Sequence, residues 1–153
     1  KNPLDMMIQK ATELGIQKFI PILSERSIVR DMNTKRIEKI IVEASEQSNR
    51  ISIPKILKPE SLKIFLQNFP KEGKIIFCDI NSNNSELKNF VSKQNKKNPV
   101  CILIGPEGDF SEKERQSIID IDQCFSLSIA SNILRAETAA IAAISVVNFY
   151  LDS

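Results

Sequence analysis

The sequence has no histidine, only four glycines and only three cysteines among its 153 residues. Without histidine, a Ser-His-Asp triad and histidine metal ligands are excluded, and a general base has to be a carboxylate, Lys, Tyr, Cys or the substrate itself. Cys78, Cys101 and Cys124 lie far apart and form no CxxC pair. This spacing argues against a zinc site and is typical of buried free thiols in a reducing compartment. We therefore expect a site that contains no metal.

Long apolar runs are absent as well. The stretch "AAIAAISVV" is far too short to span a bilayer, and the first residues contain no apolar signal segment. The net charge of +2, from 21 basic and 19 acidic residues, permits a nucleic-acid partner without arguing for one. The local basic cluster at 93–97 is typical of a solvated helix end. These features predict a cytoplasmic chain with no membrane partner.

The hydrophobic pattern predicts one α/β domain over residues 1–153, because helical and strand-like segments alternate along the chain. The expected strands are near-continuous apolar runs, which indicates a parallel sheet covered by helices on both faces. Ligands bind beyond the carboxyl ends of strands in such sheets, and three loops at 79–84, 105–110 and 129–138 qualify. The expected helices cover 4–14, 34–50, 61–69, 86–94, 111–121 and 134–151, and the expected strands cover 18–23, 74–80, 100–104 and 124–129, with a loop and short strand after residue 23.

Two of the four glycines fall in one short stretch, "ILIGPEGDFSEKE". Ser111 followed by Glu114 fits a capping box, so a helix is expected to begin there. Gly105 and Gly108 permit a positive φ or the close approach of a ligand to the backbone, and Pro106 stiffens the turn. The pattern matches neither a dinucleotide nor a triphosphate motif. A generic anion site and a tight connection without a ligand both stay open.

The last expected helix is dominated by Ala, Ile and Val after Thr138, which is typical of a helix buried in a core or a subunit interface. Arg135 lies at its start, where a cation opposes the helix dipole. Arg135 therefore needs either a partner or a function. The purely structural alternative is a salt bridge to Glu137 or Glu107.

Four blocks of the sequence together resemble a known family. They are "QKATELGIQKFIPILSERS", "EASEQSNR", "IGPEGDFSEKE" and "LSIASNILRAETAAIAA", and they resemble, in order, the blocks of the ribosomal RNA small subunit methyltransferase E family. The resemblance implies the SPOUT (alpha/beta knot) fold with a C-terminal trefoil knot, S-adenosylmethionine bound in a bent shape, and a homodimer. It also implies methylation of N3 of a uridine in 16S ribosomal RNA of the small subunit. Full-length members carry an N-terminal PUA-like β-barrel domain, which is expected to be absent from a chain that begins at Lys1.

The resemblance also assigns roles to residues. Arg135 would stabilise charge on the uracil carbonyls or hold phosphate, and Glu137 and Glu107 are candidate bases. Arg26, Arg50 and Asn132 are candidate RNA contacts, and Glu43, Gln47 and Arg50 share one helix face at i, i+4 and i+7. The implied cofactor-binding residues are Ile104, Gly105, Pro106, Glu107, Gly108, Leu127, Ser128, Ile129, Ala130, Ile133, Leu134 and Thr138.

Three positions depart from the family pattern. Ala130 stands where the family commonly has Gly, Asn132 where it has Arg, and Asp109 where it has the second glycine of a Gly-Gly pair. The first two changes bear on the geometry of the cofactor loop and on RNA affinity. Two alternatives stay open: a SPOUT methyltransferase that acts on another rRNA or a tRNA site, and a non-enzymatic α/β module that binds RNA or a nucleotide.

Overall fold

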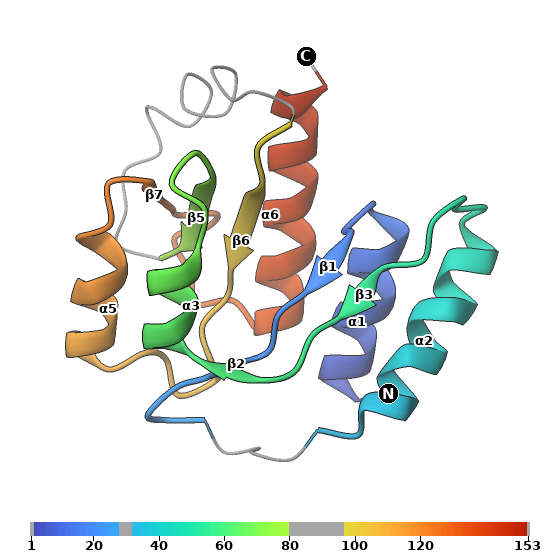
Figure 1. Ribbon diagram of the computed structural model, residues 1–153, viewed down its shortest axis with the longest axis horizontal. Coiled ribbons are helices and arrows are strands. Elements are labelled where there is room, and N and C mark those ends of the chain that lie inside the picture. The colour runs from blue at the N-terminus through green and yellow to red at the C-terminus, as the bar shows by residue number, and fades with distance from the viewer. Residues whose placement is uncertain (1, 28–31, 80–96, 153) are drawn as a thin grey trace.

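A three-stranded parallel sheet forms the centre of the fold in the computed structural model, which describes residues 2–27, 32–79 and 97–152 (Figure 1). Strand β5 (Lys74–Cys78) lies between β6 (Val100–Leu103) and β7 (Cys124–Leu127). The prediction of a parallel sheet from continuous apolar runs is therefore confirmed.

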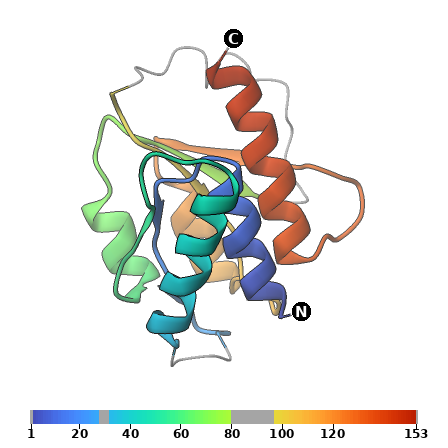
Figure 2. The same cartoon turned by 90° about the vertical axis from the view of Figure 1, so that its right-hand side faces the viewer.

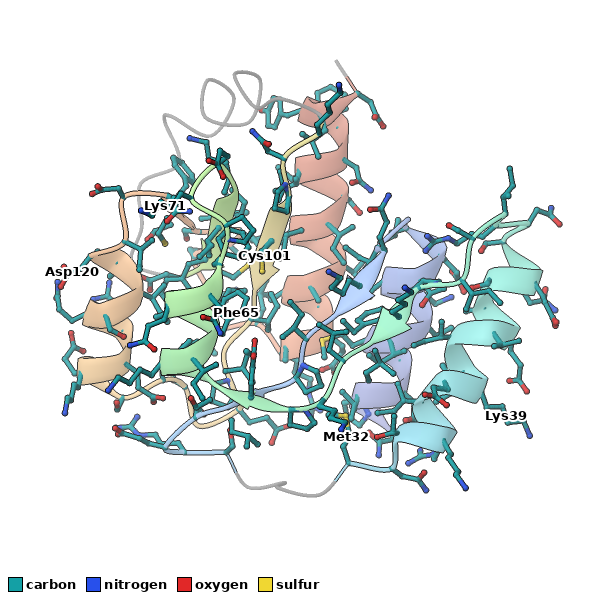
Figure 3. All side chains as sticks on the ribbon, in the orientation of Figure 1. Met32, Lys39, Phe65, Lys71, Cys101 and Asp120 are labelled. Atoms are coloured by element: carbon teal, nitrogen blue, oxygen red, sulfur yellow. The ribbon has the colours of Figure 1, made fainter. Side chains whose placement is uncertain are left out.

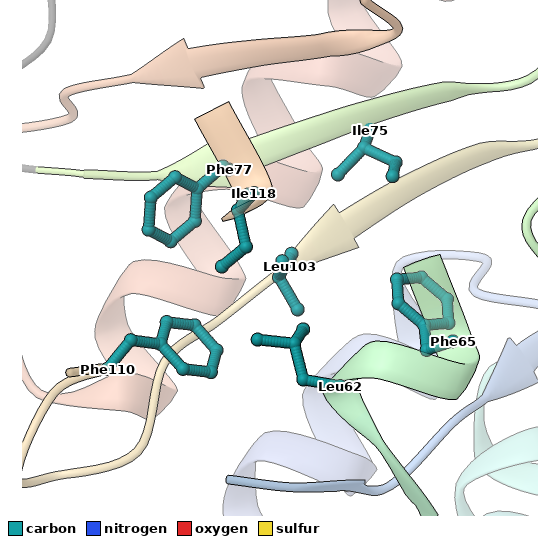
Figure 4. Packing of buried hydrophobic residues seen from close by; sticks show 7 residues of the cluster. All are labelled: Leu62, Phe65, Ile75, Phe77, Leu103, Phe110 and Ile118. Atoms are coloured by element: carbon teal, nitrogen blue, oxygen red, sulfur yellow. The ribbon is translucent and has the colours of Figure 1, made fainter. Parts of the chain in front are cut away.

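Helices cover one face of this sheet through α3 (Leu62–Asn68) and α5 (Glu112–Ile119). Ile75 and Phe77 of β5 point to this face and pack in a buried cluster (Figure 4). The other buried members of the cluster are Leu62, Phe65, Leu103, Phe110 and Ile118. Because Phe110 belongs to the loop after β6, this core extends directly under the stretch that contains two of the four glycines.

Helix α6 (Ala136–Leu151) covers the opposite face. Ile76, which lies between Ile75 and Phe77 on β5, is fully buried on this opposite face, together with Ala143 and Val147 of the helix. The strand is therefore apolar on both sides, as expected for a sheet with helices on both faces.

Helices α1 (Pro3–Glu13) and α2 (Thr34–Gln47) complete a row with α6, in which α1 lies in the middle (Figure 2). Asn2 and Asn33 cap α1 and α2 with their side chains. Ile8 of α1 packs against α2 in a third buried cluster. On its other side, the carbonyl of Leu14 accepts a hydrogen bond from the Asn148 amide of α6 at 2.7 Å.

Four two-residue strands form two parallel pairs. β1 (Lys18–Phe19) pairs with β3 (Lys55–Ile56), and β2 (Ile22–Leu23) pairs with β4 (Glu60–Ser61). Of these strands, β2 and β4 contact α3, and β3 contacts α2. The strand expected over 18–23 is thus divided, with Pro21, which has no N–H to donate, in the gap. β3 and β4 were not expected, because two residues are too few to show a strand pattern.

Other predicted boundaries also shift. Helix α2 ends at Gln47 rather than at residue 50, because Asn49 adopts a left-handed conformation with φ 56°. Arg50 consequently lies beyond the helix, where its Nη1 donates to the carbonyls of Thr12 at 2.9 Å and Ile16 at 2.6 Å. The helix expected at 86–94 lies outside the described residues, and the trefoil knot stays a prediction. Within the described residues, no helix has both the length and the apolar character needed to cross a bilayer.

Each strand of the central sheet carries one cysteine: Cys78 on β5, Cys101 on β6 (Figure 3) and Cys124 on β7. All three thiols are free. Burial raises the pKa to about 12 for Cys78, about 12 for Cys101 and about 11 for Cys124. The folded chain therefore keeps these sulfur atoms protonated, which makes them poor nucleophiles at neutral pH.

These shifts predict a loss of stability in alkali. The unfolded chain releases thiol protons from about pH 9 upward, whereas the folded chain retains them, so the free energy of unfolding falls as the pH rises from 9 towards 12. Urea unfolding at several pH values measures this. In Cys101→Ala the decline between pH 8 and pH 11 should be shallower, whatever the variant's stability at pH 7. An equally steep decline would contradict the burial argument.

Candidate functional site

The carboxyl ends of β5, β6 and β7 lie at one edge of the central sheet, because the three strands are parallel. Two of the loops picked out from the sequence therefore start at this edge: the segment 105–110, here named the elbow, and the segment 128–135, here named the crossover. With β5 between them, their starting points are about 10 Å apart, or two strand spacings.

The elbow is a tight turn whose unusual backbone conformation lies at Asp109. The N–H of Asp109 donates to the carbonyl of Pro106 at 2.8 Å, and Asp109 has φ 63°. Its carboxylate accepts a hydrogen bond from the N–H of Phe110 at 2.8 Å. A positive φ was considered for Gly105 and Gly108, but neither adopts one. Asp is one of the few residues that tolerate this conformation, because its short side chain bonds locally.

Gly105 serves close packing instead. A Cβ atom at this position would lie 3.3 Å from two carbon atoms of the Phe110 ring. That ring packs against Phe77 of the central strand, with 5.9 Å between the ring centroids. At Gly108 an added Cβ would make only an ordinary contact of 3.7 Å with Arg26. The two glycines therefore differ. Gly105 allows the elbow to fold closely over the Phe110 ring, whereas a side chain at Gly108 would meet only an ordinary van der Waals contact.

The segment that contains Arg26 docks against the elbow and the start of α5. Nη1 of Arg26 donates to the carbonyl of Gly108 at 3.2 Å, and the N–H of Glu25 donates to Glu114 at 3.3 Å. Glu114 also completes the predicted capping box with Ser111. Arg26 and Glu25 stay exposed, so a predicted RNA contact through Arg26 would lie directly beside the elbow.

The crossover leaves the sheet at Leu127, which is buried, and reaches the surface at Asn132 and Ile133. Both residues are exposed, and the relative exposure of Ile133 is 90%. It stands out as a wide loop beside α6 (Figure 2). Ser128 donates its hydroxyl to the carbonyl of Ala130 at 3.3 Å. The N–H groups of residues 130–134 make no hydrogen bond with any described part of the chain, so these backbone donors remain available to a ligand.

Arg135 is the N-cap residue of α6 and makes no capping bond with its side chain. Its side chain is 76% exposed, and its Nη1 lies 3.9 Å from Oε1 of Glu137, whose side chain is only 13% exposed. The salt bridge considered from the sequence is thus present, but at this exposure and distance it stabilises little. Most donors of Arg135 remain available to a ligand. Glu107 and Thr138 are also exposed.

Arg50 lies apart from these residues, because its Nη1 is bonded to backbone carbonyls near the end of α1. Glu43 and Gln47 are exposed on α2. The structure does not bring these three residues to the sheet edge. An RNA contact through Arg50 stays a prediction.

A hollow of about 440 Å³ lies elsewhere, between α2 and the strand β3. Its lining is Glu38, Ile41, Val42, Ile53, Pro54, Lys55, Ile56 and Leu57. None of the predicted site residues is among them. We place the candidate site at the sheet edge, because unpaired backbone donors and the largely exposed guanidinium of Arg135 lie there, whereas the hollow offers mainly apolar side chains. Among the described residues, no group of His, Cys, Asp or Glu is arranged to hold a metal ion.

A family model described as an RNA methyltransferase domain matches residues 1–148. The chain belongs to this family. It is 35% identical over 147 residues to a ribosomal RNA small subunit methyltransferase E from Rickettsia conorii, covering 95% of this chain and 59% of the relative. The protein of that name from Bacillus subtilis is 33% identical over 161 residues, covering 99% and 62%. The resemblance read from the four sequence blocks is therefore confirmed.

A solved structure extends the comparison to three dimensions. The ribosomal RNA small subunit methyltransferase E from Neisseria gonorrhoeae, bound to S-adenosyl methionine, matches with a TM-score of 0.86 and 28% identity, over 97% of this chain and 61% of that one. The expected α/β SPOUT fold is confirmed. The chain spans about three fifths of the length of the curated relatives that it matches.

One pair of residues at this edge escaped the sequence reasoning. Asp79, directly after β5, is 8% exposed and lies 2.6 Å from Arg115 of α5. The only sequence signal is a carboxylate placed at the end of an apolar strand. Its partner lies 36 residues further along, where nothing in the helix pattern marks it.

The two glycines of the elbow allow a matched test. In Gly105→Ala the new methyl group presses on the Phe110 ring, so we expect a loss of about 1–3 kcal/mol in the free energy of unfolding. Gly108→Ala adds the same group where space is free, and stability should change by less than about 0.5 kcal/mol. Urea unfolding compares the two variants. Equal losses would show that packing at Gly105 does not shape the elbow.

Proposed function

We propose that this chain is the methyltransferase domain of an S-adenosylmethionine-dependent enzyme that methylates N3 of a uridine in 16S ribosomal RNA. One observation carries the proposal: the unpaired backbone donors of the elbow and the crossover lie at the same sheet edge as an exposed guanidinium. The relative from Neisseria gonorrhoeae, which is named for the small-subunit RNA and bound to S-adenosyl methionine, supports the same assignment.

The donors present suit a nucleoside cofactor. The N–H groups of Gly105 and Gly108 and those of residues 130–134 are unpaired within the described chain, and such groups can bond the polar edge of an adenine. Ile129, Ile133 and Leu134 supply apolar surface for the ring. S-adenosylmethionine, when bound, supplies a methyl carbon made electrophilic by its sulfonium. The protein's task is then to align the acceptor and to shield the site.

Arg135 and the two carboxylates act on the uracil in this proposal. N3 carries a proton at neutral pH, and the proton has to leave as the new N–C bond forms. The exposed guanidinium of Arg135 stabilises the negative charge that develops on the uracil carbonyl oxygens. Glu137, at the start of α6, and Glu107, in the elbow, are the candidate proton acceptors. Glu137 is the more enclosed of the two.

The proposed RNA surface surrounds this edge. Arg26 lies against the elbow and Asn132 at the exposed crossover, and both offer donors for phosphate or base contacts. We also propose that the protein acts in the cytoplasm, as a homodimer. Phe149 of the apolar helix α6 is 69% exposed, and this exposed aromatic ring supports an apolar contact with a second subunit.

A methylation assay tests the proposal. The protein is incubated with S-adenosylmethionine and, in separate reactions, with 16S rRNA, small ribosomal subunits or tRNA, and the modified nucleoside is identified by mass spectrometry. N3-methyluridine in 16S rRNA supports the proposal. A different nucleoside or RNA indicates the related enzyme with another target. If no RNA is modified and S-adenosylhomocysteine does not bind, the remaining interpretation is a non-enzymatic module that binds RNA or a nucleotide.

The role of Arg135 gives a sharper prediction. Arg135→Ala should lower kcat by roughly 100-fold, because one charge-stabilising donor is lost, while S-adenosylhomocysteine binds as before. Lys39→Ala, on the exposed face of α2 (Figure 3), is the control and should leave kcat unchanged. Wild-type turnover by Arg135→Ala would exclude the assigned role.

A further inference from the structure

Asp79 occupies the middle of the carboxyl edge, between the elbow and the crossover. It directly follows the central strand, and its N–H donates to the carbonyl of Leu127 at 2.8 Å. On the other side, Phe77 is paired with Leu103, which places Asp79 level with Gly105. A shift of Asp79 would therefore displace the first residues of both the elbow and the crossover.

Arg115 reaches Asp79 from the first turns of α5. Its Nη2 lies 2.6 Å from Oδ2 of Asp79, and its Nη1 lies 3.6 Å from Oε1 of Glu112. The side chains of Asp79 and Arg115 are 8% and 28% exposed, whereas that of Glu112 is 84% exposed. The hydrogen bond that Arg115 donates to the Asp79 carboxylate raises the pKa of Arg115. The contact with Asp79 is thus the enclosed one, and the contact with Glu112 is a solvated surface pair.

The orientation of Arg115 indicates that the ion pair holds α5 and β5 in place rather than adding to the stability of the fold. Its Nε is buried and has no hydrogen-bond partner among the described residues, so the guanidinium is aimed at Asp79 and leaves one of its own donors unsatisfied. An enclosed ion pair also adds little net stability compared with apolar side chains of similar size. The pair does, however, fix the distance between the helix and the strand.

That distance matters because α5 is rigidly continuous with the elbow. The capping box of Ser111 and Glu114 joins the first turn of α5 to the end of the elbow. Arg115 is the next residue after Glu114. A link from Arg115 to Asp79 therefore ties the elbow to the end of β5, and through the Asp79 N–H to the beginning of the crossover.

We propose that Asp79 and Arg115 are a positioning pair that sets the spacing between elbow and crossover, and thereby the affinity for the nucleoside cofactor. The inference rests on the proposed function, since it needs a nucleoside to bind between these segments. Neither residue contacts the reacting atoms in this account. Their effect passes through the backbone of the two segments.

Titration calorimetry with S-adenosylhomocysteine tests the pair. Asp79→Asn and Arg115→Met should each raise the Kd roughly tenfold, because small displacements of binding groups are costly. Arg115→Lys, which keeps a cation for the single short contact, should recover most of the affinity. Glu112→Gln removes only the exposed partner of Arg115 and should bind as the wild type does.

A second readout separates positioning from a purely structural role. In methylation assays with saturating RNA, the KM for S-adenosylmethionine should rise in Asp79→Asn while kcat changes by less than about twofold, because the reacting groups are untouched. All measurements are made at a temperature at which circular dichroism shows each variant to be folded. The double variant Asp79→Asn/Arg115→Met removes both charges of the enclosed pair and is measured in place of a single variant that does not fold.

The outcomes are distinct for the two proposals. A wild-type Kd in Asp79→Asn and in the double variant would overturn the positioning role while leaving the proposed function intact. An affinity loss that Arg115→Lys does not reverse would overturn it too, as would a fall in kcat at unchanged KM. If the wild-type chain itself does not bind S-adenosylhomocysteine, the proposed function fails, and the positioning role fails with it.

Discussion

Backbone hydrogen bonds between β5 and its two neighbours determine where the rest of the chain lies. The ladders pair Phe77 with Leu103 and Cys78 with Leu127, so three carboxyl ends meet at one edge. Complete burial of Ile75 and Ile76, on opposite faces, holds this register. A slip by one residue would move every side chain of the strand to the wrong face. The elbow and the crossover come together only because that slip is prevented.

The elbow shows how packing can replace a sequence motif. Its stretch fits no phosphate-binding pattern, yet it has a defined shape, because Phe110 is anchored in the core and Gly105 admits the ring. The left-handed turn lies at Asp109, where the resemblance points to a glycine in the family. A non-glycine residue costs about 1–2 kcal/mol in that conformation, and the hydrogen bond from the N–H of Phe110 offsets part of it. The departure from the family pattern is thus compatible with the turn.

Features carried by long apolar segments were predictable from the sequence, and features carried by single contacts were not. The three central strands, the capping box at Ser111 and the covered faces all follow from local patterns. The pairs β1–β3 and β2–β4 do not, because each strand has only two residues. The bonds of Arg50 to α1 and of Arg115 to Asp79 join residues more than 30 positions apart, which no periodicity records. The positive φ that was considered for Gly105 and Gly108 is found instead at Asp109, where a hydrogen bond to its side chain supports it.

Hydrogen exchange with and without S-adenosylhomocysteine tests the central claim most directly, namely that the elbow and the crossover together form the cofactor pocket at the sheet edge. Binding is expected to slow exchange at the amides of Gly105, Glu107 and Gly108 and at those of residues 130–134 in the same titration, since these N–H groups have no hydrogen-bond partner within the described chain. Protection confined to one of the two segments would contradict the account. So would protection of the hollow lined by Val42 and Ile53, with both segments left unchanged.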